Sequence, residues 1–411
     1  MGSTRDAGLP ELQSVRAAAA DLVGGAQRTP LLSAPAIGSM ADCTLWLKAE
    51  TLQRTGSFKL RGAYRRLRTL PPETLGVVTA SAGNHAQGVA LAASHRGISA
   101  TVVMPETAAL PKIMATRAYG AEVVLHGTNY DDAHTRAQEL ASERGLPLIH
   151  PFDDPEVVAG QATVGLELAE ELPDVEVAVV PVGGGGLIAG VGAVLRTLCP
   201  GCRIIGVAAA RAPGIHDSWR AGHVVSQPAT QTLADGLAVK RPTPASLARL
   251  TQVADDLVLV EEDEIAWAML VLMERARLVA EGAGAAPLAA LLARRVPAAA
   301  GRRTVAIVSG GNVDAATLGR VIGRGLARAG RYVTISTLVV DRPGSLARLL
   351  AAVAATGANV LGVAHSRLRG GVPLGETAVE LTLETRDREH VVDVLRRLRQ
   401  AGYATATADG D

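Results

Sequence analysis

A lysine set among apolar residues, Lys59, is a candidate for covalent chemistry. It stands between Phe58 and Leu60, after a Thr-Gly-Ser turn and just before a predicted helix that includes Ala63. An amine packed among apolar groups loses the hydration of its charged form, so its pKa falls toward the range where it acts as a nucleophile or a base. These are the surroundings that a Schiff-base lysine needs. A surface lysine whose stem lies along a helix is the alternative that these residues alone leave open.

A second stretch, Ser81-Ala82-Gly83-Asn84-His85, follows a predicted strand and opens a predicted helix. Its glycine allows close approach of the backbone, and the N–H groups at the start of the helix form an anion site of the size of a carboxylate. Taken alone, the stretch is explained more simply as a capped strand-to-helix turn.

A third stretch, Gly183-Gly184-Gly185-Gly186-Leu187, lies between an apolar strand and a helix. Glycines cost conformational entropy on folding, so four in a row indicate a backbone that comes very close to something. Bare amides at a helix N-terminus bind phosphate well. A nucleotide-binding loop is the alternative, but the lysine of a P-loop does not follow. A fourth stretch, Ser309-Gly310-Gly311-Asn312, is by itself a generic turn after a strand.

Together these stretches resemble the fold-type II pyridoxal 5'-phosphate (PLP) enzymes. The form Thr-Gly-Ser-Phe-Lys-x-Arg-Gly-Ala around Lys59 is similar to the threonine/serine dehydratase branch, and the other motifs follow in family order. Three weaker segments fit the family too: His150 to Asp154, Ala234-Asp235-Gly236, and Glu281 to Ala285 with Gly282 in place of a usual proline. Glu281 is either a supporting group of the site or a helix-end charge.

The resemblance implies a role for each matching residue. Lys59 would hold PLP and act as the catalytic residue, Asn84 would hydrogen-bond the PLP 3'-oxygen, and Ser309 would place its hydroxyl on the pyridine nitrogen. The other residues implied to bind the cofactor are Phe58, Gly183, Gly184, Gly185, Gly186 and Leu187. Those implied to surround the substrate carboxylate are Ser81, Ala82, Gly83 and His85.

The reaction implied is β-elimination of L-threonine to 2-oxobutanoate and ammonia, and of L-serine to pyruvate, with a place in isoleucine biosynthesis. Ala82 stands where a related serine racemase carries a serine, which disfavours racemisation. Alanines 208 to 210 follow the strand after which racemase-like dehydratases carry a metal carboxylate, so no metal is expected, although Asp217 lies nearby. A dehydratase of another β-hydroxy amino acid, a β-replacement enzyme and a catalytically silent amino-acid sensor remain open.

The elements that must position these residues alternate along the chain. Apolar runs predict strands at 76–80, 100–104, 122–125, 146–150, 175–182 and 203–207. Predicted helices separate them, which indicates parallel βαβ units with helices on both faces. Ligands of such α/β sheets bind beyond the carboxyl ends of the strands. The resemblance implies a tryptophan synthase β-like catalytic domain of two subdomains over residues 1–330, with the small subdomain at about 53–155.

From Arg331 the pattern changes to strand, helix, two strands, helix and strand, the βαββαβ order of a ferredoxin-like fold. Its strands are expected at 332–340, 359–369, 377–385 and 403–407. The turn Asp341 to Leu346 resembles the ACT ligand-sensing domain, which implies an amino-acid effector and a homodimer or homotetramer for residues 331–411. A dimerisation module with an unused effector site is the alternative.

Composition excludes several classes of function. The 411 residues carry a formal net charge of +1, with 48% hydrophobic and 2% aromatic residues, so neither a nucleic acid nor a membrane surface is an expected partner. The first ten residues lack the apolar run of a signal peptide. Three sparse cysteines indicate a reducing compartment, and the cytoplasm is the expected location. Neither the preferred amino acid nor the effector can be predicted from the sequence.

Overall fold

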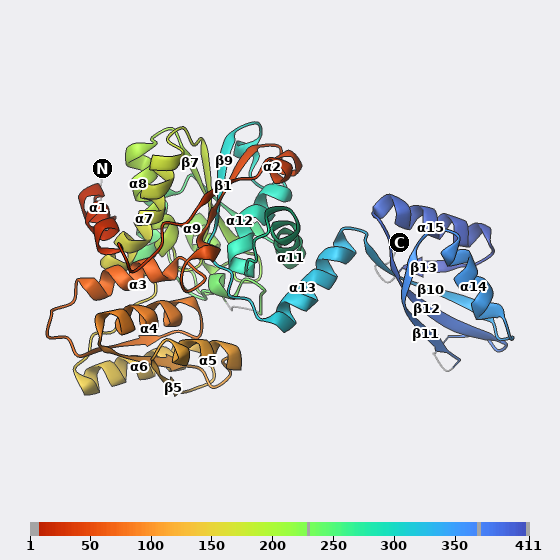
Figure 1. The fold of residues 1–411 in the computed structure, drawn as a ribbon, viewed down its shortest axis with the longest axis horizontal. Coiled ribbons are helices and arrows are strands. Elements are labelled where there is room, and N and C mark those ends of the chain that lie inside the picture. Colours follow the sequence, from red (N-terminus) through yellow and green to blue (C-terminus); the bar gives the residue numbers. More distant parts are fainter. Residues whose placement is uncertain (1–7, 228–230, 368–370, 408–411) are drawn as a thin grey trace. The chain divides into compact units, whose positions relative to one another are not determined.

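The computed structural model describes residues 8–227, 231–367 and 371–407 (Figure 1). The chain divides into two compact units, Met1–Ala315 and Ala316–Asp411. Helix α13 (Ala315–Arg328) begins at this boundary. Both units are built from helices and sheets, as the sequence predicted.

The first unit contains a six-stranded sheet in the order β1-β2-β9-β6-β7-β8, parallel except for the β1–β2 pair. Its strands are β1 (Leu31–Ser33), β2 (Thr44–Ala49), β6 (Val177–Pro181), β7 (Arg203–Ala209), β8 (Asp256–Val260) and β9 (Arg303–Val308). Every residue of β6 is buried, because the central strands are covered on both faces. Helices α7 (Pro155–Glu171), α8 (Gly186–Leu198) and α12 (Gly282–Leu292) provide much of this cover.

A second, parallel sheet of the same unit has the order β3-β4-β5. Its strands are β3 (Gly76–Ala80), β4 (Ser99–Met104) and β5 (Glu122–Leu125). Alternate residues of β3 and β4 face opposite sides, since side chains of a strand alternate. One side packs against α3 (Lys59–Arg68), α4 (Asn84–Arg96) and α5 (Leu110–Ala118), and the other against α6 (Tyr130–Arg144).

The strand predicted at 146–150 is wrong in extent, because only an isolated bridge pairs Leu148 with Val78. The carbonyl of Pro147 and the N–H of Ile149 still bond Val78. Proline has no N–H to donate, so Pro147 prevents a regular ladder here.

Side-chain caps stabilise the N-termini of several helices in the first unit. Asn129 caps α6 by accepting hydrogen bonds from two backbone N–H groups, and Asp154 caps α7 in the same way. A capping box of Glu261 and Glu264 opens α11 (Glu262–Val271). The other helices of the unit are α1 (Leu12–Asp21), α2 (Pro35–Ala41), α9 (Gly214–Ala221) and α10 (Pro244–Val253), with short turns η1 (Glu50–Leu52), η2 (Asp235–Leu237), η3 (Leu272–Ala276) and η4 (Pro297–Ala299).

The second unit has an antiparallel sheet in the order β11-β12-β10-β13. Its elements are β10 (Tyr332–Val340), α14 (Ser345–Ala354), β11 (Asn359–Ser366), β12 (Glu376–Glu384), α15 (Arg388–Gln400) and β13 (Thr405–Thr407). This is the predicted βαββαβ order, with the first and third strands central. The end of the strand predicted at 359–369 lies outside the described residues.

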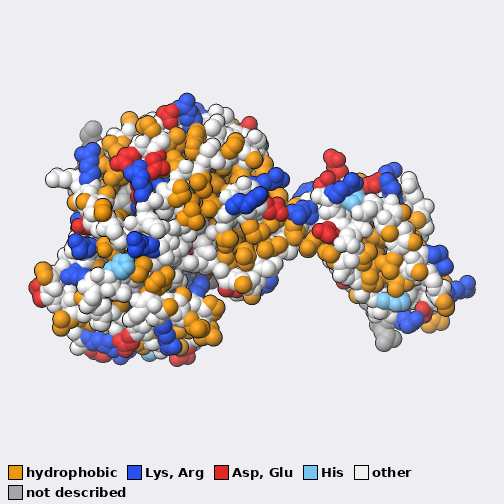
Figure 2. All heavy atoms as spheres, in the orientation of Figure 1, with side chains coloured by type: hydrophobic (Ala, Val, Ile, Leu, Met, Phe, Trp, Pro, Cys, Tyr) orange, Lys and Arg blue, Asp and Glu red, His pale blue; other side chains and the backbone are white. Residues whose placement is uncertain are grey.

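The mixture of charged side chains on the surface agrees with the small net charge of the chain. Figure 2 shows basic and acidic side chains interspersed on the visible face, with hydrophobic atoms between them. Among the residues that the structure describes, no helix has the length and apolar character needed to cross a membrane.

Candidate active site

Lys59 is the first residue of α3, and its amine is enclosed by protein although the residue as a whole is only partly buried. Its Nζ donates a hydrogen bond to the carbonyl of Pro151 at 2.9 Å and lies 5.2 Å from the centre of the Phe58 ring. Burial lowers the pKa of Lys59 to about 8, and the carboxyl of Glu281 opposes this shift. The environment predicted from the apolar neighbours of Lys59 is therefore present.

The turn before Lys59 is joined to the turn that holds Ser309, 250 residues later in the chain. The N–H of Phe58 donates to the carbonyl of Ser309 at 3.0 Å, and the N–H of Gly311 donates to the carbonyl of Gly56 at 2.9 Å. Gly56 has a φ of 70°, a left-handed conformation that glycine adopts without strain. Ser309 is 3% exposed and follows the carboxyl end of β9.

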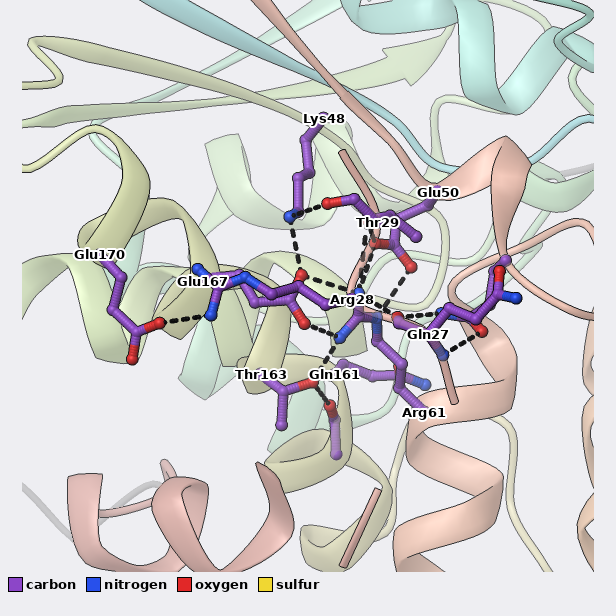
Figure 3. Close-up of polar contacts among 12 residues, drawn as sticks. Gln27, Arg28, Thr29, Lys48, Glu50, Arg61, Gln161, Thr163, Glu167 and Glu170 are labelled. Atoms are coloured by element: carbon purple, nitrogen blue, oxygen red, sulfur yellow. Dashed lines mark hydrogen bonds and ion pairs between the residues drawn. The ribbon is translucent and has the colours of Figure 1, made fainter. Parts of the chain in front are cut away.

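A buried ionic network connects α3 to its neighbouring elements (Figure 3). Arg61, two residues after Lys59, is 1% exposed and bonds the carboxylates of Glu50 and Glu167 at 2.6 to 2.9 Å. Burial works against the charge of Arg61, but the two carboxylates raise its pKa above the usual value. Lys48 adds a further ion pair to Glu167 at 2.7 Å. The network joins β2, η1, α3 and α7, so the first turn of α3 has little freedom to move.

Asn84 begins α4, and hydrogen bonds hold its amide on both sides. Its Nδ2 donates to Oε1 of Glu281 at 2.6 Å, while its Oδ1 accepts from Nδ2 of Asn312 at 2.8 Å. In the same loop, the hydroxyl of Ser81 accepts from the N–H of Gly83 at 3.2 Å. The loop thus has the local hydrogen bonds of a capped turn and, in addition, contacts to two distant segments.

His85 is neutral at physiological pH, because burial and the nearby amine of Lys59 lower its pKa to about 3. Its Nε2 lies 3.1 Å from the carbonyl of Ile149, which assigns the proton to Nε2. Its Nδ1 is then an acceptor, and it is buried without a partner among the described residues. The hydroxyl of Ser57 is likewise buried and unpartnered there.

The tetraglycine loop connects β6 to α8, and its first two glycines have no space for side chains. A Cβ on Gly183 would lie 2.6 Å from the carbonyl oxygen of Gly236, and one on Gly184 would overlap the ring of Phe152. Gly185, the N-cap of α8, has a φ of 85° and offers no side chain to cap the first turn. The amides of this turn are therefore placed to bind an anion. Phe152 follows Pro151, the partner of Lys59, so the loop and the amine share a neighbour.

Three further groups contribute to this region: Glu281, for which the sequence left a supporting role open, and Asn312 and Pro151, for which it predicted no individual role. Glu281 is 6% exposed, and burial followed by the carboxylate of Asp235 raises its pKa to about 8. Asn312 holds Asn84, and its place in the Ser-Gly-Gly-Asn turn is the sequence feature that could have identified it. The carbonyl of Pro151 carries no sequence signature, because every residue has a carbonyl.

The arrangement defines a class of enzyme that binds a cofactor through a lysine amine and an anion cradle. The loops after β3, β6 and β9 all follow carboxyl ends of strands, where ligands of such sheets bind. A buried amine, a glycine cradle and two unpartnered buried polar atoms fit a phosphorylated aldehyde such as PLP. Within the described ranges, no cluster of three or more His, Cys, Asp or Glu side chains could hold a metal ion.

Comparisons with known proteins identify the family. Residues 22–310 match the family described as pyridoxal-phosphate dependent enzyme, and residues 333–400 match the ACT domain. The chain belongs to the pyridoxal-phosphate dependent enzyme family, so its cofactor is PLP, as the sequence predicted.

Three similar proteins align with more than three quarters of the chain. It is 48% identical to the L-threonine ammonia-lyase of Geobacter sulfurreducens over 92% of this chain and 94% of that protein. It is 46% identical to the L-threonine ammonia-lyase of Thermotoga maritima over 95% of this chain and 98% of that protein. The processed threonine deaminase isoform 2 of Solanum lycopersicum superposes with a TM-score of 0.71 at 37% identity, over 77% of this chain and 94% of that one. The roles of individual residues remain predictions.

Proposed function

We propose that the protein is a PLP-dependent ammonia-lyase that converts L-threonine to 2-oxobutanoate and ammonia and also acts on L-serine. The observation that carries the proposal is the enclosed amine of Lys59, hydrogen-bonded to Pro151 between the Asn84 loop and the tetraglycine loop. Relatives named L-threonine ammonia-lyase that align over almost the whole chain support the choice of substrate. A place in isoleucine biosynthesis follows from the product.

When bound, PLP supplies an electron sink for the negative charge that develops at Cα of the substrate. The amine of Lys59 would be the base that takes the Cα proton, and its burial favours the unprotonated form that a base needs. Asn84 and the amides after Gly183 would hold the ring oxygen and the phosphate. The hydroxyl of Ser309 is too weak an acid to keep a ring nitrogen protonated, which suits elimination better than chemistry that needs a long-lived carbanion.

Elimination is also favoured over racemisation by the residue at position 82. Racemisation needs a second acid or base on the opposite face of the substrate. Ala82 offers no proton at this position.

The test is release of 2-oxo acid from L-threonine and L-serine by the purified, PLP-loaded protein. We expect Lys59→Ala to lower turnover by about 10³-fold or more, since it removes the base. Lys240→Ala is the matched control, because Lys240 is 48% exposed and pairs only loosely with Asp131, at 3.7 Å. A wild-type protein that binds PLP but turns over neither amino acid would refute the threonine assignment.

We further propose that the second unit binds an amino-acid effector and that the chain forms a homodimer or homotetramer in the cytoplasm. The match to the ACT domain supports effector binding, and four exposed apolar residues of β10 and β11 support association. The three cysteines are free, which agrees with a reducing compartment. Adding isoleucine or valine to the turnover assay tests the effector: a change in rate supports it, and rates independent of both contradict it.

A further inference from the structure

Glu281 is a buried carboxyl in the site to which the reaction outlined above assigns no role. It is 6% exposed, and its Oε1 accepts a hydrogen bond from Nδ2 of Asn84 at 2.6 Å. Its backbone N–H donates to the carbonyl of Gly310 at 3.0 Å, and a Cβ on Gly310 would overlap Oε1 of Glu281. The carboxyl is therefore wedged between the Asn84 loop and the turn that carries Ser309.

The hydrogen bonds around Asn84 leave its amide only one orientation. Nδ2 of Asn312 donates both to the carbonyl of Thr55, at 2.7 Å, and to Asn84. The atom of Asn84 that faces Asn312 must therefore be its oxygen, and the atom that faces Glu281 must be its nitrogen. One of the two Nδ2 hydrogens is used by Glu281, and the other remains available to a ligand.

The charges that face Glu281 come from three other elements: Asp235 in η2, Lys112 in α5 and Lys59 in α3. Lys112 and Asp235 form an ion pair with each other. Burial, the largest influence, and the carboxylate of Asp235 raise the pKa of Glu281 to about 8, while the hydrogen bond from Asn84 and the amines of Lys112 and Lys59 oppose this shift. At neutral pH the carboxyl keeps its proton, which lies on Oε2 because Oε1 accepts from Asn84.

We propose that Glu281 is a positioning residue that orients the amide of Asn84 toward the cofactor by accepting a hydrogen bond from its Nδ2. When the carboxyl of Glu281 loses its proton in alkaline solution, a full negative charge appears next to Nδ2 of Asn84, and the hydrogen bond from Asn84 to the cofactor oxygen changes. The inference rests on the proposed function, because it takes Asn84 as the residue that binds the PLP 3'-oxygen.

The experiment is a pH titration of the absorbance of bound PLP in the full-length protein, without substrate, with the PLP dissociation constant measured alongside. We expect a spectral transition in the wild type near pH 8. Glu281→Gln keeps an acceptor for Asn84 but cannot ionise, so it should bind PLP with near wild-type affinity and lack this transition. Glu281→Ala removes the acceptor and should weaken PLP binding about tenfold.

Glu264→Gln is the matched control, a buried glutamate at the start of α11 that pairs with Arg295 instead of a site residue. It should leave the transition and the PLP affinity unchanged. A Glu281→Gln protein that keeps the wild-type transition, or a Glu281→Ala protein that binds PLP as tightly as wild type, would overturn the proposal. If Glu281→Ala does not fold, the isosteric Glu281→Gln variant still tests the proposal. The titration contains no substrate, so its outcome is independent of the turnover assay that tests the proposed function.

Discussion

At the scale of single residues, the site places two groups whose ordinary charges are both disfavoured by burial. The pKa of Lys59 falls to about 8 and that of Glu281 rises to about 8, so each is close to exchanging its proton near neutral pH. Each also opposes the shift of the other, since opposite charges stabilise one another. Lys59 and Glu281 therefore influence each other's protonation in the cofactor-free protein.

The protonation of Glu281 predicts how the stability of the cofactor-free protein changes with pH. The folded state binds this proton more strongly than the unfolded state, whose pKa is near the ordinary 4.5. The contribution of Glu281 to stability therefore falls as pH rises from about 4.5 to 8. Relative to Glu281→Gln, we expect the wild type to lose on the order of a few kcal/mol between pH 5 and pH 8.

Urea unfolding of both cofactor-free proteins at several pH values measures this difference. The comparison with the Gln variant removes the contributions of all other titrating groups. Lys59 affects stability over a separate pH range. Because its pKa is lowered in the folded protein, stability rises with pH between about 8 and 10.5. Curves for the two proteins that stay parallel from pH 5 to pH 8 would show that Glu281 is ionised throughout.

The tetraglycine loop predicts a strong and local effect of one methyl group. A Cβ on Gly184 would overlap the aromatic ring of Phe152, which has neighbours of its own and cannot yield without cost. We expect Gly184→Ala to weaken PLP binding by about tenfold or more, which equilibrium titration with PLP would measure. Gly201→Ala is the control, since nothing lies within 4 Å of its Cβ. Wild-type affinity in Gly184→Ala would mean that the loop relaxes freely.

At the scale of elements, α3 is held by buried charges more than by its own helical tendency. Arg61 neutralises Glu50 and Glu167, which have little access to solvent. Removing one member of such a buried set leaves the others uncompensated, which is far more costly than never having the set.

We therefore expect Arg61→Met to lower the free energy of unfolding by about 3 to 5 kcal/mol. Arg136→Met on α6 is the control: its ion pairs to Glu139 and Glu143 are exposed and screened by solvent, so its loss should cost far less stability. Urea unfolding of the cofactor-free proteins compares the two. Equal effects of both substitutions would contradict a special role for the network.

Much of the element order could be predicted from the sequence, and the exceptions have physical causes. The bounds of β3, β5 and β10 agree with the predicted strands, because apolar runs bounded by turn residues are unambiguous there. The region of α10 to α12 was not predicted. Helix α12 is apolar on all sides and contains Pro287, so it shows no amphipathic period.

The site was predictable where a motif carries side-chain chemistry. Lys59, Asn84 and the tetraglycine run stand out by composition and order. The hydrogen bonds from Asn84 to Glu281 and from Asn312 to Asn84 join residues about 200 positions apart in the chain, and single-sequence patterns do not report such contacts. Only the fold places these side chains next to one another.

At the scale of the whole molecule, the second unit exposes apolar side chains that a folded monomer would leave in water. Leu338 and Val340 of β10 are 40% and 50% exposed, and Leu361 and Val363 of β11 are 46% and 44% exposed. β11 is an edge strand, and an edge with free backbone groups and apolar side chains favours pairing with another chain. These residues support the proposed oligomer.

We expect the double substitution Leu361→Glu and Val363→Glu to lower the association state of the full-length protein, because two charges per chain would be buried at the pairing edge. Sedimentation velocity of the PLP-loaded protein measures this. Val392→Glu is the control, as Val392 is 65% exposed and belongs to helix α15 instead of the edge strand β11. An unchanged association state in the double variant would place the subunit contact elsewhere, whereas a shift accompanied by loss of the isoleucine or valine response would connect assembly to regulation.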